Sequence, residues 1–165
     1  MTFWTKHNER LLLLFVLAAG AFLRFYHYSD ISFSNDELSA ILRLQYDDFA
    51  TLINEGVRPD GHPAFTQVSM WFMGRNFGMT EASLRFLPVV ASTLALLCTY
   101  MLGKKGFNET AGLFAAATLV FLEYVLTYSQ VARPYPFGLC FTVMFAYSWY
   151  LLLFEHEKRQ WLKIL

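Results

Sequence analysis

Charged residues are scarce in this sequence. Lys, Arg, Asp and Glu make up 16% of its 165 residues, whereas soluble domains carry about 25%. Hydrophobic residues make up 56% instead, which is typical of a membrane protein and excludes a disordered tail, a coiled coil and an ordinary soluble domain. The 13 basic residues are balanced by 13 acidic residues. This zero net charge argues against a nucleic-acid-binding protein, because such a surface needs a basic surplus.

Cysteine is also rare. Only Cys98 and Cys140 occur, and both lie inside apolar runs. Two cysteines in such positions exclude a framework of disulfides. We interpret both as small hydrophobic residues.

Long apolar runs are the strongest signal in the chain. A helix that crosses a membrane needs about 20 mostly apolar residues, and four runs meet this length. They predict an all-α, polytopic membrane helical bundle formed as one module over residues 1–165. The four transmembrane helices are expected at about 9–28, 84–103, 109–130 and 135–154.

The first run has an alternative interpretation. The small residues 18–21 resemble the cleavage site of a signal peptide. The apolar segment continues beyond them, however, through Arg24, Phe25, Tyr26 and Tyr28. The polar tips of these side chains can reach the lipid headgroups, which favours a membrane anchor.

The positions of the basic residues predict the orientation of the helices. With four crossings, three basic clusters fall on one face, which the positive-inside rule makes cytoplasmic. These clusters are Lys6 and Arg10, then Lys104 and Lys105, then Lys158, Arg159 and Lys163. The N-terminus is therefore expected in the cytoplasm, and residues 29–83 form one long outer loop. Its short apolar stretch, 63–74, is expected to be interfacial or re-entrant rather than a fifth crossing.

The outer loop opens with Ser34, Asn35, Asp36 and Glu37, followed by apolar residues at helical spacing. Ser34 and Glu37 match a capping box, so an amphipathic juxtamembrane helix is expected to begin here. Glu37 is then either only a cap or a functional group. Asp36 lies in the first turn, where it either stabilises the helix dipole or acts as a general base for a hydroxyl.

Further polar residues lie along the same outer face. His62 precedes a proline at the expected start of another helix, where free backbone amides can receive an anion. Arg85 and Arg133 lie at the outer ends of two crossings, where they either anchor helix ends or bind a ligand. Glu123 falls inside the third crossing, and its expected neighbour is an arginine such as Arg133 or a cavity water. The acids Asp47, Asp48, Glu55 and Asp60 are predicted to form a solvated face and loop.

The order of these features resembles the N-terminal module of membrane glycosyltransferases of the GT-C fold, in the branch of protein O-mannosyltransferases and lipid A aminoarabinose transferases. The resemblance covers nearly the whole chain. It is carried by a first crossing, the pair Asp36-Glu37, the tripeptide 61–63 (GHP), the segment 77–85 (FGMTEASLR) and the segment 128–135 (YSQVARPY).

The resemblance implies an enzyme that transfers a sugar from a polyprenyl phosphate carrier to an acceptor hydroxyl, on the outer face and with inversion. Asp36 is then the catalytic base, and Glu37 orients the acceptor or a divalent metal ion, which the sequence neither requires nor excludes. The residues implied to bind substrate are His62, Arg85, Arg133 and Tyr135. Arginine suits this role because its fork of donors matches phosphate oxygens.

The implied partners are the polyprenyl phosphate-linked sugar, a lipid, glycan or protein acceptor, and membrane lipids. The expected location is a cell membrane, such as the bacterial inner membrane. The last residues, 161–165, resemble the start of another apolar segment, so we expect the chain to be the N-terminal part of a longer enzyme. The alternative is a non-catalytic membrane subunit that binds a lipid carrier or assembles with a larger complex.

Overall fold

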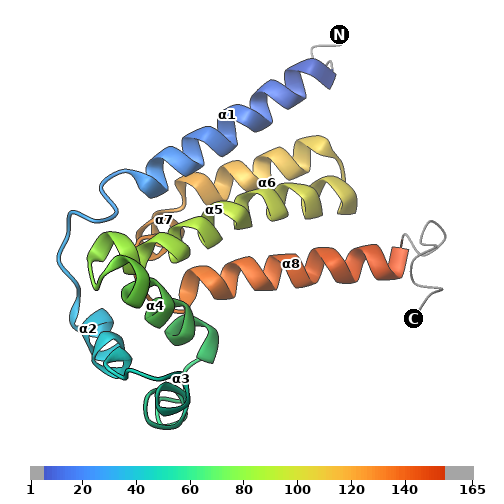
Figure 1. The fold of residues 1–165 in the computed structure, drawn as a ribbon. Coiled ribbons are helices and arrows are strands. Elements are labelled where there is room, and N and C mark those ends of the chain that lie inside the picture. Colours follow the sequence, from blue (N-terminus) through green and yellow to red (C-terminus); the bar gives the residue numbers. More distant parts are fainter. Residues whose placement is uncertain (1–5, 155–165) are drawn as a thin grey trace.

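The computed structural model describes residues 6–154, and these residues fold into helices without any strand. The helices over residues 6–25, 81–106, 109–121 and 135–154 run side by side, whereas the others gather at one end (Figure 1). The elements in chain order are α1 (Lys6–Phe25), α2 (Asn35–Ile41), η1 (Leu42–Leu44), α3 (Phe49–Thr51), η2 (Leu52–Val57), α4 (Ala64–Phe77), α5 (Glu81–Gly106), α6 (Glu109–Phe121), α7 (Glu123–Ser129) and α8 (Tyr135–Phe154). The all-α prediction is confirmed.

Helix α5 is the centre of the bundle, since α1, α6 and α8 all pack against it. At one end lie the α5–α6 turn, the start of α1 and the end of α8 (Figure 1). There Lys104 forms an ion pair with Glu109, and the Tyr150 hydroxyl donates to the Lys105 carbonyl at 2.7 Å. Helices α2, α3 and α4 lie at the opposite end. The predicted outer loop is therefore separated from the described basic residues of the α5–α6 turn by the length of the bundle.

Two helices of the described chain, α5 and α8, are long and apolar enough to cross a membrane. The pair α6 and α7 gives a third crossing if it counts as one span, but it is bent by 65°. The expected first crossing, 9–28, corresponds to α1, which carries Glu9, Arg10 and Arg24 and does not qualify by composition. The prediction of a multi-pass bundle is thus confirmed, and the number four is not. The basic residues Lys158, Arg159 and Lys163 lie outside the described residues.

The predicted crossing 109–130 is not one continuous helix. Leu122 has an extended backbone (φ −70°, ψ 107°) and separates α6 from α7. Glu123 therefore begins α7 at this bend, and its side chain is exposed. The expected pairing with Arg133 is also wrong, because Arg133 contacts Asp36 and His62.

Arg24 also differs from its prediction, because it is fully buried rather than extended to the headgroups. Its guanidinium donates to Ser92 Oγ at 2.9 Å and to the carbonyl of Leu119 at 2.9 Å. A straight α6–α7 helix would pair that carbonyl with the N–H of residue 123. Arg24 therefore satisfies a backbone group that the break at Leu122 releases.

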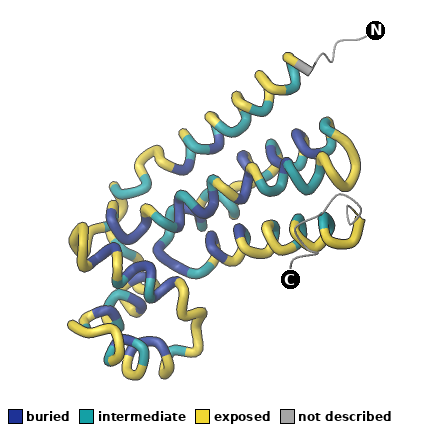
Figure 2. The backbone as a smooth tube through the Cα atoms, turned by 45° about the vertical axis from the view of Figure 1, so that its right-hand side comes forward, coloured by how far each residue is buried: buried dark blue, intermediate teal, exposed yellow. Residues whose placement is uncertain are grey.

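Many large apolar residues of the long helices are exposed, and Figure 2 marks exposed positions along these helices in yellow. Helix α8 exposes Phe141, Phe145 and Trp149, and α6 exposes Phe114 and Phe121. A helix that is apolar on all sides belongs in a core or in lipid. The membrane explains these faces, since the described residues of the chain do not cover them.

The short helices are held by a buried cluster that joins them to the bundle. It comprises Ala40, Leu44, Leu52, Val57, Met70, Met73, Leu84 and Ala132. Leu84 belongs to α5, and Ala132 belongs to the connection between α7 and α8. The cluster therefore fixes the predicted outer loop against the two segments that carry Arg85 and Arg133.

Candidate functional site

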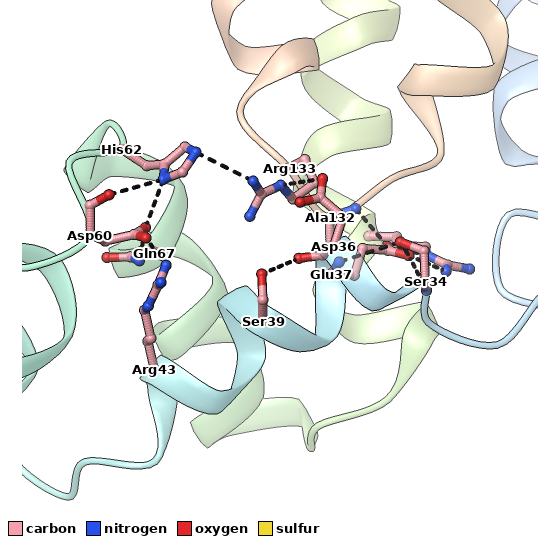
Figure 3. Close-up of polar contacts among 11 residues, drawn as sticks. Ser34, Asp36, Glu37, Ser39, Arg43, Asp60, His62, Gln67, Ala132 and Arg133 are labelled. Carbon is pink, nitrogen blue, oxygen red and sulfur yellow. Dashed lines mark hydrogen bonds and ion pairs between the residues drawn. The ribbon is translucent and has the colours of Figure 1, made fainter.

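Asp36, His62 and Arg133 meet at the end of the bundle, although they are far apart in the sequence (Figure 3). Arg133 Nε lies 2.8 Å from Asp36 Oδ2, and Arg133 Nη2 lies 3.3 Å from His62 Nε2. About half of the Asp36 side chain is exposed (52%), whereas the Arg133 side chain is nearly buried (7%). An accessible carboxylate thus lies beside a sheltered cation.

The guanidinium of Arg133 keeps an unused donor. Its Nε forms an ion pair with Asp36 but makes no hydrogen bond. Buried polar groups are ordinarily paired. This donor is buried, so an anionic group beside Asp36 would reach it once the guanidinium turns.

Local sequence explains how Asp36 and His62 are presented. Ser34 caps α2, and the predicted capping box with Glu37 is confirmed. Asp36 is the second residue of this helix and points away from the core. Gly61 adopts φ +67°, which glycine reaches without strain, and Pro63 caps α4. This tight turn presents His62 at the start of α4.

Glu37 and Arg85 form a second, buried pair next to this contact. Arg85 Nε and Nη2 each donate to the Glu37 carboxylate at 2.8 Å. Its other donors bind the carbonyls of Tyr28, Ile31 and Ser32. All five N–H groups of this guanidinium are thus occupied. Arg85 lies at Glu37 and not in the cluster of Arg133 and His62.

The Glu37 carboxylate is equally occupied. Besides Arg85, it accepts the backbone N–H of Ala132 at 2.8 Å and the N–H and hydroxyl of Ser34 at 2.9 and 3.0 Å. Burial raises the pKa of Glu37, but these hydrogen bonds and the Arg85 charge outweigh it and lower the pKa below its usual value. Glu37 therefore stays ionised and ties α2 to α5 and to the segment that carries Arg133.

Asp60 contradicts its prediction as a solvated residue, since its side chain is only 2% exposed. It forms an ion pair with Arg43, accepts a hydrogen bond from Gln67 Nε2 at 2.5 Å and lies 3.1 Å from His62 Nδ1. The short spacing of Asp60 and His62 is the one local signal in the sequence that could have indicated this contact. Arg43 and Gln67 carry no such signal.

Tyr135 lies apart from the polar cluster. Its ring packs edge-on against Tyr128 with centroids 4.9 Å apart. It borders a cavity of about 110 Å³, lined by Ser92, Tyr124, Val125, Tyr128, Ser129, Tyr135, Pro136 and Leu139. A second cavity of about 170 Å³ lies against Arg85 and Glu37.

A metal centre has little support among the described residues, where no group of three His, Cys, Asp or Glu side chains could hold an ion. Of the pair Asp36-Glu37, only Asp36 has an open side. The oxygens of Glu37 are taken by Arg85, Ser34 and Ala132. Any bound cation would therefore depend on Asp36 and on groups supplied by a ligand.

Comparisons with known proteins support the resemblance derived from the sequence. Nothing among the curated proteins or the solved structures matches the chain. Residues 61–165 match the model of the family described as dolichyl-phosphate-mannose-protein mannosyltransferase. Because this match covers more than half of the chain, the protein belongs to that family of GT-C type membrane glycosyltransferases.

Proposed function

We propose that this chain is the N-terminal catalytic module of a longer enzyme that transfers a sugar from a polyprenyl phosphate carrier to an acceptor hydroxyl. The acceptor would be a protein, a lipid or a glycan. The proposal depends mainly on the contact between Asp36 and Arg133. It pairs an exposed carboxylate with a buried guanidinium that still has an unused donor. Family membership supplies the class of donor and reaction.

In this proposal Asp36 is the general base. The acceptor oxygen attacks the anomeric carbon and its proton passes to the Asp36 carboxylate, while the bond between that carbon and the phosphate oxygen breaks. The bonding electrons leave with the polyprenyl phosphate. A single displacement of this kind inverts the anomeric carbon. The phosphate is a good leaving group, so the site needs a base and cations more than an acid.

Arg133 would hold the phosphate, and His62 would orient the guanidinium by accepting from its Nη2. A guanidinium matches phosphate oxygens in two-point geometry. When the phosphate binds, the guanidinium would rotate about its contact with His62, which would bring the unused Nε donor to the phosphate and release Asp36 for the acceptor. Tyr135, which packs against Tyr128 apart from this cluster, would offer an aromatic face to another part of the substrate.

Glu37 and Arg85 are assigned a positioning role rather than direct contact with substrate. Their hydrogen bonds to each other and to the backbone leave no free donor on Arg85. The Glu37 bond to the N–H of Ala132 fixes the residue next to Arg133. The pair would thus hold Asp36 and Arg133 at the same place.

The site would lie on the outer face of a cell membrane, such as a bacterial inner membrane, with the N-terminus in the cytoplasm and α1 as a fourth crossing. This orientation is supported by the basic residues of the α5–α6 turn, which lie at the opposite end of the bundle. The positive-inside rule assigns such residues to the cytoplasm.

The decisive variant is Asp36→Asn in the full-length protein, assayed with a radiolabelled polyprenyl phosphate sugar. We expect transfer to fall by at least about 10²-fold, the contribution of a general base, while binding of the lipid donor persists. Asp47→Asn is the matched control, since Asp47 is also an exposed aspartate of the outer loop. Wild-type transfer by Asp36→Asn would exclude Asp36 as the base. Donor binding without any transfer by the unmodified protein would favour the non-catalytic subunit.

A further inference from the structure

We propose that Asp60 is a positioning residue that keeps His62 in one tautomer, with the proton on Nδ1, so that Nε2 accepts a hydrogen bond from Arg133. The inference extends the proposed function, because it names a residue that would set the direction of the phosphate-binding guanidinium. It depends on the contacts of three side chains, Asp60, His62 and Arg133 (Figure 3).

The hydrogen-bonding capacity of each group determines the tautomer. His62 Nδ1 faces the Asp60 carboxylate at 3.1 Å and the Asp60 carbonyl at 3.2 Å, and both can only accept. Nδ1 must therefore donate. His62 Nε2 faces Arg133 Nη2 at 3.3 Å, and a guanidinium can only donate. Nε2 must therefore accept, which a neutral imidazole does only when its proton is on Nδ1.

The Asp60 carboxylate is itself fixed in orientation. Arg43 Nη1 forms an ion pair with Oδ1, and Gln67 Nε2 donates to Oδ2, the oxygen that also faces His62. The side chain of Asp60 is 2% exposed. Arg43 and Gln67 thus hold the carboxylate with one oxygen directed at the imidazole.

The consequence for Arg133 is a guanidinium held on two sides. Asp36 faces its Nε, and His62 accepts from its Nη2. A long side chain loses less conformational freedom on binding when its planar end is already oriented. Asp60 would therefore favour binding of the lipid-linked sugar without touching it.

The variant Asp60→Asn provides a specific test because the local contacts predict its amide orientation. Arg43 requires an acceptor at the Oδ1 position, so the new NH₂ takes the place of Oδ2 and faces His62 Nδ1. Gln67 can rotate its amide to accept the other N–H, because its Oε1 has no partner. The Asp60 carbonyl also lies 3.2 Å from Nδ1, but the new N–H takes the nearer position at 3.1 Å, so we expect Nδ1 to accept from it. The proton then moves to Nε2, and Nε2 can no longer accept from Arg133.

The first measurement is ¹⁵N NMR of histidine-labelled full-length protein, which distinguishes the two tautomers without any assay of activity. The His62 signal is identified by its loss in His62→Gln. We expect it to report a proton on Nδ1 in the wild type and on Nε2 in Asp60→Asn. Arg43→Gln is the control, since it removes an ion-pair partner of Asp60 and should leave the His62 tautomer unchanged.

The second measurement is the affinity for a polyprenyl phosphate, followed together with KM and kcat for transfer of its mannosyl form. His62→Gln can place an amide oxygen near Nε2 and should keep the affinity within about threefold, whereas His62→Asn and Asp60→Asn should weaken it about tenfold, the loss of one hydrogen bond to a charged group. KM should change more than kcat.

The proposal would be overturned by a wild-type proton on Nε2, or by an Asp60→Asn protein with unchanged tautomer and affinity. If the protein transfers no sugar, the proposed function fails. The NMR result and the lipid affinity still decide this inference.

Discussion

Arg85 and Glu37, 48 residues apart in the chain, bind each other at two points with both distances at 2.8 Å. The pair joins the start of α5 to the first turn of α2. Because Glu37 also accepts the N–H of Ala132, the same carboxylate fixes the connection between α7 and α8. Three segments that surround Asp36 therefore depend on one buried side chain.

The substitution Glu37→Gln should strongly destabilise the protein. It leaves the Arg85 guanidinium buried with its charge uncompensated, and breaking a buried pair in this way costs about 3–5 kcal/mol. Thermal unfolding of the purified protein in detergent measures the loss. Glu55→Gln, which changes an exposed glutamate of the same loop, should be nearly neutral. Equal melting temperatures for the two variants would contradict the assigned role of Glu37.

The contribution of Glu37 to stability should depend on pH. The folded state lowers the pKa of this carboxyl from its ordinary value of 4.5. A lowered pKa means that the contribution is fully present above about pH 4.5 and is lost as the pH falls through the lower, folded value. The difference in melting temperature between wild type and Glu37→Gln should therefore be constant near neutral pH and shrink in acid. A difference that grows on acidification would have the wrong sign.

Close backbone contact between α5 and α6 gives a third prediction. A Cβ atom on Gly112 would lie 2.5 Å from the Tyr100 carbonyl oxygen, whereas one on Gly106 would meet nothing within 4 Å. Gly112→Ala should therefore push the helices apart and cost about 1–3 kcal/mol. Gly106→Ala is the matched control and should be neutral or slightly stabilising. The comparison is made by thermal unfolding, and equal effects of the two substitutions would exclude tight packing at Gly112.

Local patterns in the sequence predicted what depends on neighbouring residues. Ser34 and Glu37 are three residues apart, so their capping box could be identified without any tertiary information. The apolar lengths of α5 and α8 likewise predicted helices long enough to cross a membrane. The proline after His62 also predicted that a helix begins next to this side chain.

Features set by distant partners could not be predicted in this way. The burial of Asp60 depends on Arg43 and Gln67, which hydrophobic periodicity does not connect to it. The break at Leu122 occurs in residues 113–133, a stretch without glycine or proline. The Leu119 carbonyl that the break leaves without a helical partner accepts from Arg24 of another helix. Tertiary contacts of this kind override local helix propensity.

The orientation of the bundle can be tested by labelling cysteines in intact cells. In a Cys98→Ala, Cys140→Ala background, Gly106→Cys marks the basic α5–α6 turn, and Glu55→Cys marks the loop region beside α4. Both positions are exposed, and a Cβ at Gly106 meets no neighbour. A membrane-impermeant maleimide should label Glu55→Cys in intact cells and Gly106→Cys only after lysis, because the positive-inside rule retains Lys104 and Lys105 in the cytoplasm. Labelling of Gly106→Cys in intact cells would reverse the orientation and place Asp36 on the cytoplasmic side, where the proposed outer-face transfer could not occur.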